Sequence, residues 1–200
     1  MSYRGMLAAE RAEMIELLRG LTDAQWDTES LCAGWRVREV VGHLLTDTLG
    51  PPAYLRAAIQ HRGNVDRINN ALAASFAAQS TAELVDSFAH RAGRLSKYSP
   101  RLMLADLLVH QQDIRRPLGL PRTIPADRLT AVLSHPDPFA FPGRRTKGLR
   151  FVATDVDWSA GDGPEIRGPG EALALAMVGR AVVLDELTGD GVPELRRRSA

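Results

Sequence analysis

One stretch of the chain decides its fold, and it has the sequence RLMLADLLVHQQDIRRPLG at residues 101–119. At about 100° of rotation per residue, its apolar side chains occupy nearly the whole circumference of a helix. Such a helix has to be enclosed by neighbouring elements. Ser99 and Pro100 provide an N-cap and a first-turn proline, and Pro117 and Gly119 end the helix. The sequence therefore predicts a central, buried helix.

This central helix carries three ionisable side chains on one side. Asp106, His110 and Asp113 occupy positions i, i+4 and i+7, which lie along one strip of an α-helix. Apolar residues flank the strip, and ionisable groups in apolar surroundings need hydrogen-bonding partners or a metal ion. The strip is therefore expected to be half of a functional site.

The segments before the central helix are also predicted to be helical. Apolar residues recur there at helical spacing, and capping-box patterns at residues 22–25 and 80–83 mark two helix starts. The predicted helices cover residues 3–21, 36–49, 54–62, 64–78 and 80–95. The alanine-rich helix at residues 64–78 offers a face on which a second copy of the chain could pack as a homodimer.

The character of the sequence changes after the central helix. A predicted helix at residues 126–134 is followed by a proline-rich connector, a strand-like alternation at residues 149–158, a short partner strand and a helix at residues 169–187. The chain is thus predicted to be mostly α, with a helical bundle at residues 1–140 and a small α+β region at residues 141–200.

The composition limits the partners and the compartment. The 25 basic and 24 acidic side chains nearly cancel, so neither nucleic acid nor a membrane surface is an expected partner. The single cysteine, Cys32, fits a reducing compartment and is expected to serve in packing. No secretory signal pattern opens the sequence, and no run approaches the roughly 18 apolar residues of a membrane span. These features favour a cytoplasmic protein.

Two predicted helices together provide the ligands of a metal site. His43 comes from the helix at residues 36–49, and Asp106 and His110 come from the central helix. Zinc binds imidazole nitrogen and carboxylate oxygen, and three protein ligands leave one position open for water, a thiol or a substrate, as in catalytic sites. The alternative is a helix pair that only buries salt bridges with Arg115 or Arg116.

Two further aspartates are expected to support these ligands. Asp113 follows His110 by about one helical turn, and Asp47 follows His43 in the same way. A carboxylate that accepts a hydrogen bond from a ligating imidazole fixes the orientation of that ring. We therefore expect Asp113 to orient His110 and Asp47 to orient His43.

Two motifs resemble those of a known family. They are LCAGWRVREVVGHL at residues 31–44 and DLLVHQQDIRRPLG at residues 106–119, and they are similar to the mycothiol-dependent maleylpyruvate isomerase-like family within the DinB-like superfamily. The resemblance implies a DinB-like four-helix bundle with a metal between its helices. It also implies that His43, Asp106 and His110 are the ligands and that mycothiol or another low-molecular-weight thiol is a cosubstrate.

The ligand set departs from the family at one position. Isomerases of the family have a glutamate four residues before the second histidine, where this chain has the shorter Asp106. Aspartate can still bind a metal, but it draws the ion closer to its own helix. The resemblance therefore supports metal binding more strongly than it supports maleylpyruvate chemistry.

The function favoured by these features is that of a zinc-dependent, thiol-using isomerase or S-transferase. A bound metal would lower the pKa of a thiol, which would then attack an electrophilic substrate. The residues expected to border or bind the thiol and the substrate are Trp35, Arg115, Arg116 and Arg180. The alternative is a non-catalytic metal-binding or stress-response bundle in which the ion only stabilises the fold.

Overall fold

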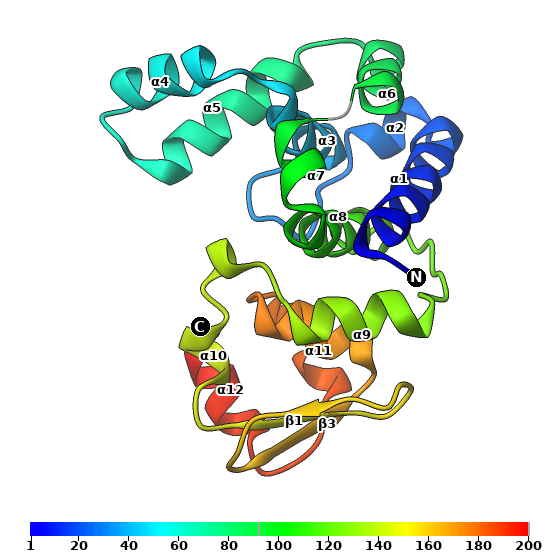
Figure 1. Ribbon diagram of the computed structural model, residues 1–200, viewed down its shortest axis with the longest axis vertical. Coiled ribbons are helices and arrows are strands. Elements are labelled where there is room, and N and C mark those ends of the chain that lie inside the picture. The colour runs from blue at the N-terminus through cyan, green and yellow to red at the C-terminus, as the bar shows by residue number, and fades with distance from the viewer. Residues whose placement is uncertain (92, 200) are drawn as a thin grey trace.

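Helices make up most of the structure, a computed structural model that describes residues 1–91 and 93–199 (Figure 1). The elements of the N-terminal part are α1 (Tyr3–Gly20), α2 (Asp23–Trp26), α3 (Val37–Leu45), the 3-10 helix η1 (Thr46–Thr48), α4 (Pro51–Gln60), α5 (Val65–Ala77), α6 (Thr81–His90), α7 (Arg94–Tyr98) and α8 (Pro100–Arg115). Four of these helices, α1, α3, α6 and α8, form a ring in which each packs against two others. The predicted four-helix bundle is therefore present.

The C-terminal part combines short helices with a small sheet. Its elements are α9 (Ala126–Ser134), η2 (Pro138–Ala140), α10 (Gly143–Thr146), β1 (Arg150–Ala153), β2 (Ser159–Ala160), β3 (Glu165–Gly168), α11 (Gly170–Met177), η3 (Ala181–Glu186) and α12 (Val192–Arg198). The strand order is β2-β1-β3, with β1 antiparallel to β2 and parallel to β3. Helices α9 and α11 lie between α8 and this sheet (Figure 1).

Helix α8 is enclosed, as its sequence predicts. Between Met103 and Ile114, every residue except Asp106 is buried. Pro100 lies in the first turn, but Ser99 makes no capping hydrogen bond, because its backbone (φ −132°, ψ 58°) departs from the usual N-cap conformation. The expected side-chain cap is therefore wrong, although the helix begins where predicted.

Two hydrophobic cores meet at α8. Leu107 packs with residues of α1, α3 and α6, whereas Leu104 and Leu108 pack with α9, α11 and the sheet. The helix thus joins the bundle to the C-terminal part. Helix α9 shares the second core with the sheet, and the domain boundary expected between residues 140 and 141 stays a prediction.

Several element boundaries differ from those predicted. The strand expected at residues 149–158 ends at Ala153, because the chain then turns and Ala153 N–H donates to the carbonyl of Trp158. The helix expected at residues 169–187 divides into α11 and η3, since Gly179 has a φ of +95° that ends the first helix. Similarly, the helix expected at residues 80–95 ends at His90.

A buried cluster of ions ties α1 to α9. Oε1 of Glu10, a fully buried residue, lies 2.5 Å from Nη2 of Arg122, and its Oε2 lies 2.7 Å from Nη1 of Arg128. Glu13 pairs with the same two arginines. Buried ions require such partners, so this cluster fixes how the bundle meets the C-terminal part.

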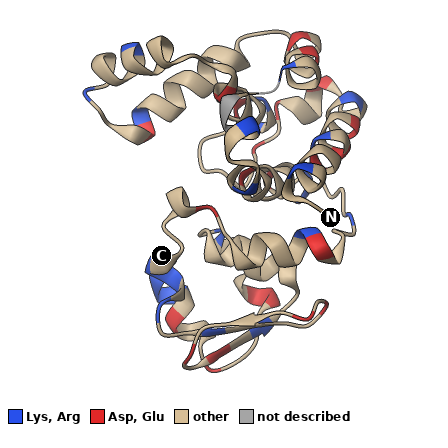
Figure 2. Ribbon diagram, in the orientation of Figure 1, with Lys and Arg blue, Asp and Glu red and all other residues tan. Residues whose placement is uncertain are grey.

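Charges are otherwise spread over the molecule. Figure 2 shows acidic and basic residues interspersed along the ribbon, with basic residues gathered on α12. None of the helices in the described ranges 1–91 and 93–199 is both long and apolar enough to cross a membrane.

Candidate metal centre

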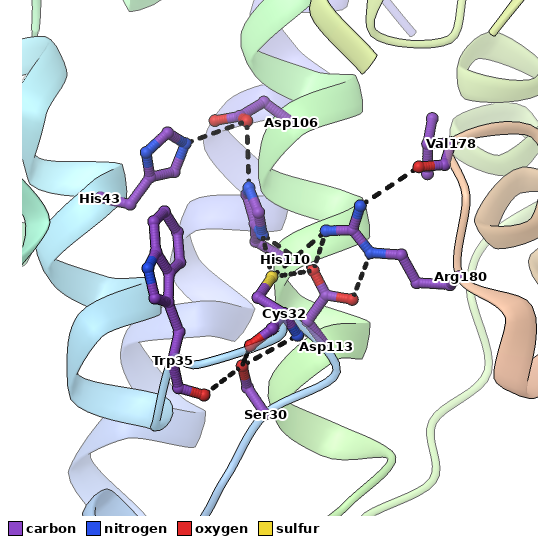
Figure 3. Close-up of polar contacts among 9 residues, drawn as sticks. All are labelled: Ser30, Cys32, Trp35, His43, Asp106, His110, Asp113, Val178 and Arg180. Atoms are coloured by element: carbon purple, nitrogen blue, oxygen red, sulfur yellow. Dashed lines mark hydrogen bonds and ion pairs between the residues drawn. The ribbon is translucent and has the colours of Figure 1, made fainter. Parts of the chain in front are cut away.

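Three side chains from two helices converge at the junction of α3 and α8 (Figure 3). Oδ1 of Asp106 lies 3.7 Å from Nε2 of His43 and 3.4 Å from Nε2 of His110. Two ligand atoms on one tetrahedral ion, each bonded at about 2.1 Å, are separated by roughly 3.4 Å. The residues that sequence reasoning assigned as ligands are thus brought together at a spacing that fits one metal ion.

The position of His43 depends on close packing of α3. Gly42, the preceding residue, faces α5, and a Cβ added to it would lie 2.4 Å from the carbonyl oxygen of Ala73. Only glycine allows this approach of the two helices. Val40, Val41 and Leu44 are buried around it, so α3 is held firmly and presents His43 toward α8.

His110 is oriented by a second carboxylate. Its Nδ1 lies 2.8 Å from Oδ2 of Asp113, and its Nε2 faces Asp106. Because an ionised carboxylate only accepts hydrogen bonds, Nδ1 carries the proton and Nε2 is left to bind a metal. This hydrogen bond matches the one expected from the spacing of the two residues on α8.

Asp113 is in turn held by two groups that are distant in the sequence. Arg180 donates from Nε to Oδ1 at 2.9 Å and from Nη2 to Oδ2 at 2.6 Å. The thiol of Cys32 donates to Oδ2 at 3.1 Å. Cys32 also packs against the bundle core as expected, but sequence reasoning missed its polar contacts. Cys32 lies within the motif of residues 31–44, and this position is the feature of the sequence that indicates a place at the site.

A second group of possible ligands, Cys32, His110 and Asp113, lies on the other side of the His110 ring. The Arg180 guanidinium already occupies that side, with Nη2 at 2.6 Å from Asp113 and 3.3 Å from the Cys32 sulfur. A metal ion there would meet this positive charge at short range. The donor set of His43, Asp106 and His110 is therefore the better cation site.

The electrostatics of the cluster favour a bound cation. Burial alone would raise the pKa of Asp106, but hydrogen bonds from His110 and His43 outweigh burial and lower it. Burial opposes protonation of His110, yet its contacts with Cys32, Asp106 and Asp113 raise its pKa well above the ordinary value. The negative field that holds a proton on His110 would equally attract a divalent cation in its place.

Asp47 does not have the role that was predicted for it. It accepts hydrogen bonds from the backbone N–H of Ser96 at 3.0 Å and from the Ser96 hydroxyl at 2.8 Å. Nδ1 of His43 is buried without a hydrogen-bond partner among the described residues. The expected pairing fails because α3 ends at Leu45, and η1 turns Asp47 away from His43.

The arginines at the end of α8 lie away from the cluster. Arg116 pairs with Glu171 at 2.7 Å and with Glu186 at 2.6 Å, which ties α8 to the C-terminal part. Arg115 donates to the backbone carbonyl of Leu120. Among the described residues, neither forms the salt bridges with Asp106 or Asp113 that the alternative required, and their expected role in binding a ligand stays a prediction.

Trp35 borders the cluster on the α3 side. Its ring lies 5.2 Å from that of His43, and its Nε1 donates to Oδ1 of Asn70 on α5 at 2.9 Å. The indole is thus fixed beside His43, and its expected contact with a bound ligand stays a prediction.

Replacing Asp113 by asparagine is expected to lower metal affinity roughly 10- to 100-fold, because the amide no longer fixes the His110 ring as a carboxylate does. Competition with a chelating dye measures this change. Asp66→Asn, an exposed change on α5, is the matched control and should leave the affinity unchanged. Equal affinities for Asp113→Asn and the native chain would show that Asp113 does not support the site.

Comparison with known proteins identifies similar sequences and folds. Residues 7–98 match the model of the mycothiol maleylpyruvate isomerase N-terminal domain. The crystal structure of a mycothiol-dependent maleylpyruvate isomerase aligns with a TM-score of 0.65 and 13% identity, covering 94% of this chain and 91% of that one. A histidine-to-alanine mutant of that isomerase aligns with a TM-score of 0.63. The search of curated proteins finds no match.

At 13% identity, the structural match establishes the fold, while the family model identifies the N-terminal domain. The predicted fold class, a mostly α chain with a DinB-like bundle, is confirmed. Residues 7–98 therefore match the mycothiol maleylpyruvate isomerase N-terminal domain and, over 94% of its length, the chain has the DinB-like fold seen in the mycothiol-dependent maleylpyruvate isomerase.

Proposed function

We propose that the chain is a metal-dependent isomerase that uses mycothiol, or a similar low-molecular-weight thiol, to act on a cis-unsaturated dicarboxylate such as maleylpyruvate. The observation that carries this proposal is the convergence of His43, Asp106 and His110 within this fold. Two imidazole nitrogens and one carboxylate oxygen form a donor set suited to zinc. A reduced thiol is most available in the cytoplasm, where we place the reaction.

The shorter carboxylate is compatible with this role. Asp106 reaches both histidines, at 3.7 and 3.4 Å, so the loss of one methylene relative to glutamate does not separate the ligands. The side chains of His43 and Asp106 are 22% and 15% exposed. The cluster is thus open to solvent on one side, as a site that admits a thiol requires.

When bound, a zinc ion would leave one coordination position open and lower the pKa of a thiol that enters it. His43, Asp106 and His110 would hold the ion, and Asp113 keeps the His110 proton on Nδ1. Asp113 stays ionised in its buried position, because hydrogen bonds from His110 and Arg180 lower the pKa of that carboxyl against the effect of burial. Trp35 restricts water on the side of His43.

The isomerisation itself needs no oxidant or reductant. The sulfur adds to one carbon of the cis double bond, and the electron pair of that bond moves onto the oxygen of the conjugated carbonyl. Rotation about the resulting single bond and expulsion of the sulfur then give the trans isomer. The thiol returns unchanged, so the site has only to activate the sulfur and orient the substrate carboxylates.

Conversion of maleylpyruvate, followed by ultraviolet absorbance with and without mycothiol, tests this proposal. The expected result is conversion that requires the thiol and disappears when a chelator removes the metal. A chain that binds metal yet gives no thiol-dependent conversion would instead be a non-catalytic metal-binding bundle, and the proposed function would be wrong.

A further inference from the structure

Arg180, one of the three arginines expected to bind carboxylates of the thiol or the substrate, already has partners within the chain. Its Nε and Nη2 donate to Asp113, and its Nη1 lies 3.3 Å from the carbonyl oxygen of Val178. Each nitrogen of this guanidinium therefore has a partner within the chain, and the buried carboxylate compensates its charge. A substrate carboxylate therefore has to be bound by a different cationic group.

Arg145, on α10, is a partly buried cation without such compensation. Its Nη1 donates to the carbonyl of Ala140 at 3.1 Å, and its Nε is buried without a hydrogen-bond partner. Among residues 1–91 and 93–199, no acidic side chain forms an ion pair with it. Nε and Nη2 form the edge that Arg180 uses to bind Asp113, and in Arg145 this edge has no hydrogen-bond acceptor within the described part of the chain.

The backbone beside Arg180 holds the Arg145 guanidinium in place. A Cβ added to Gly179 would lie 2.5 Å from Nη2, 2.7 Å from Cζ and 3.0 Å from Nε of Arg145. These distances show that the glycine lies against the Nη2, Cζ and Nε atoms of the guanidinium, where a larger residue would collide with them. Gly179 also has a φ of +95°, which favours glycine at this position.

Arg145 therefore contacts two segments, at Ala140 and at Gly179, whose neighbouring residues interact with the residues of the cluster. Gly179 directly precedes Arg180, which contacts Asp113. Ala140 belongs to η2, and Asp137 at the start of η2 is close enough to the ligand cluster to be affected by its charges. Burial and the charges of Arg180 and Arg144 lower the pKa of Arg145, as expected for a cation that lacks an anion.

We propose that Arg145 binds a carboxylate of the substrate through the Nε and Nη2 edge of its guanidinium. This inference rests on the dicarboxylate substrate of the proposed function and assigns the residue that recognises it. A guanidinium edge matches a carboxylate with two parallel hydrogen bonds, and an uncompensated cation gains most from binding an anion. Arg180 then acts as a positioning residue for Asp113 and His110.

Titration calorimetry with maleate, on the metal-loaded chain, tests the role of Arg145. Arg145→Gln keeps an amide that can donate to Ala140 but removes the charge, and it should weaken maleate binding about 10- to 100-fold. Arg145→Lys should recover part of the affinity. Metal content, mycothiol binding and thermal midpoint should remain those of the native chain in both variants.

Arg144→Gln is the matched control, because Arg144 is an exposed cation on the same helix whose guanidinium lies over the Phe141 ring. It should change maleate affinity less than about twofold, as surface charges contribute little. Unchanged maleate binding in Arg145→Gln, or an equal loss in Arg144→Gln, would overturn the inference.

The maleate experiment also separates this inference from the proposed function. If the native chain shows no thiol-dependent isomerisation but its maleate binding still depends on Arg145, the anion site stands and only the proposed function fails. If the native chain catalyses isomerisation but Arg145→Gln binds maleate as tightly as the native chain, this inference alone fails.

Discussion

Replacing His110 by alanine is expected to lower metal affinity by more than about 100-fold, beyond the effect of altering a group that only orients a ligand. Thiol-dependent conversion of maleylpyruvate should be lost with the metal. The physical reason is that His110 supplies one of three protein ligands and is oriented by the hydrogen bond that its Nδ1 donates to Asp113. Elemental analysis and chelator competition measure the effect.

The control for this change is His90→Ala. His90 is an exposed histidine on α6 that pairs with Asp86, away from the cluster. Its removal should leave metal content and activity unchanged. If His110→Ala retained the metal of the native chain, the ion would have to bind elsewhere and the assigned ligand set would be wrong.

Replacing Glu10 by glutamine is expected to lower the free energy of unfolding by about 3 kcal/mol. The change leaves Arg122 and Arg128 without the fully buried carboxylate that pairs with both. We expect a loss of unfolding free energy at the lower end of the range that is typical of a broken buried ion pair, because Glu13 still faces the two arginines. Urea unfolding should show a lower midpoint with an unchanged slope.

Glu16→Gln, an exposed change on the same helix, is the matched control and should alter stability by less than about 0.5 kcal/mol. A loss for Glu10→Gln as small as that of the control would contradict the role assigned to the ion cluster. It would mean that the contact between α1 and α9 rests on apolar packing alone.

The parts of the fold that the sequence predicts are those determined locally. Apolar periodicity and the Pro100 start identify α8, and capping boxes identify the starts of α2 and α6. Element ends were less predictable, because tertiary contacts and single backbone conformations such as that of Gly179 decide them. The buried ion cluster around Glu10 could not be predicted from the sequence either, since the partners of Glu10 lie 112 and 118 residues away.

The same distinction applies to the site. Asp106, His110 and Asp113 share one helix, so spacing alone places them together, and the motif around His43 adds the other helix. Cys32 and Arg180 are separated by 148 residues, and no local pattern indicates that both contact Asp113. The position of Arg145 cannot be predicted in this way, because nothing in a sequence shows that a cation lacks a partner.

The central claim is that His43, Asp106 and His110 bind a metal that the isomerisation requires. Elemental analysis of chain purified without a metal-binding tag, combined with the mycothiol assay before and after chelation, tests it most directly. We expect about one zinc ion per chain, loss of conversion when the ion is removed and recovery when zinc is returned. A folded, metal-free chain that converts maleylpyruvate at the same rate would contradict the claim.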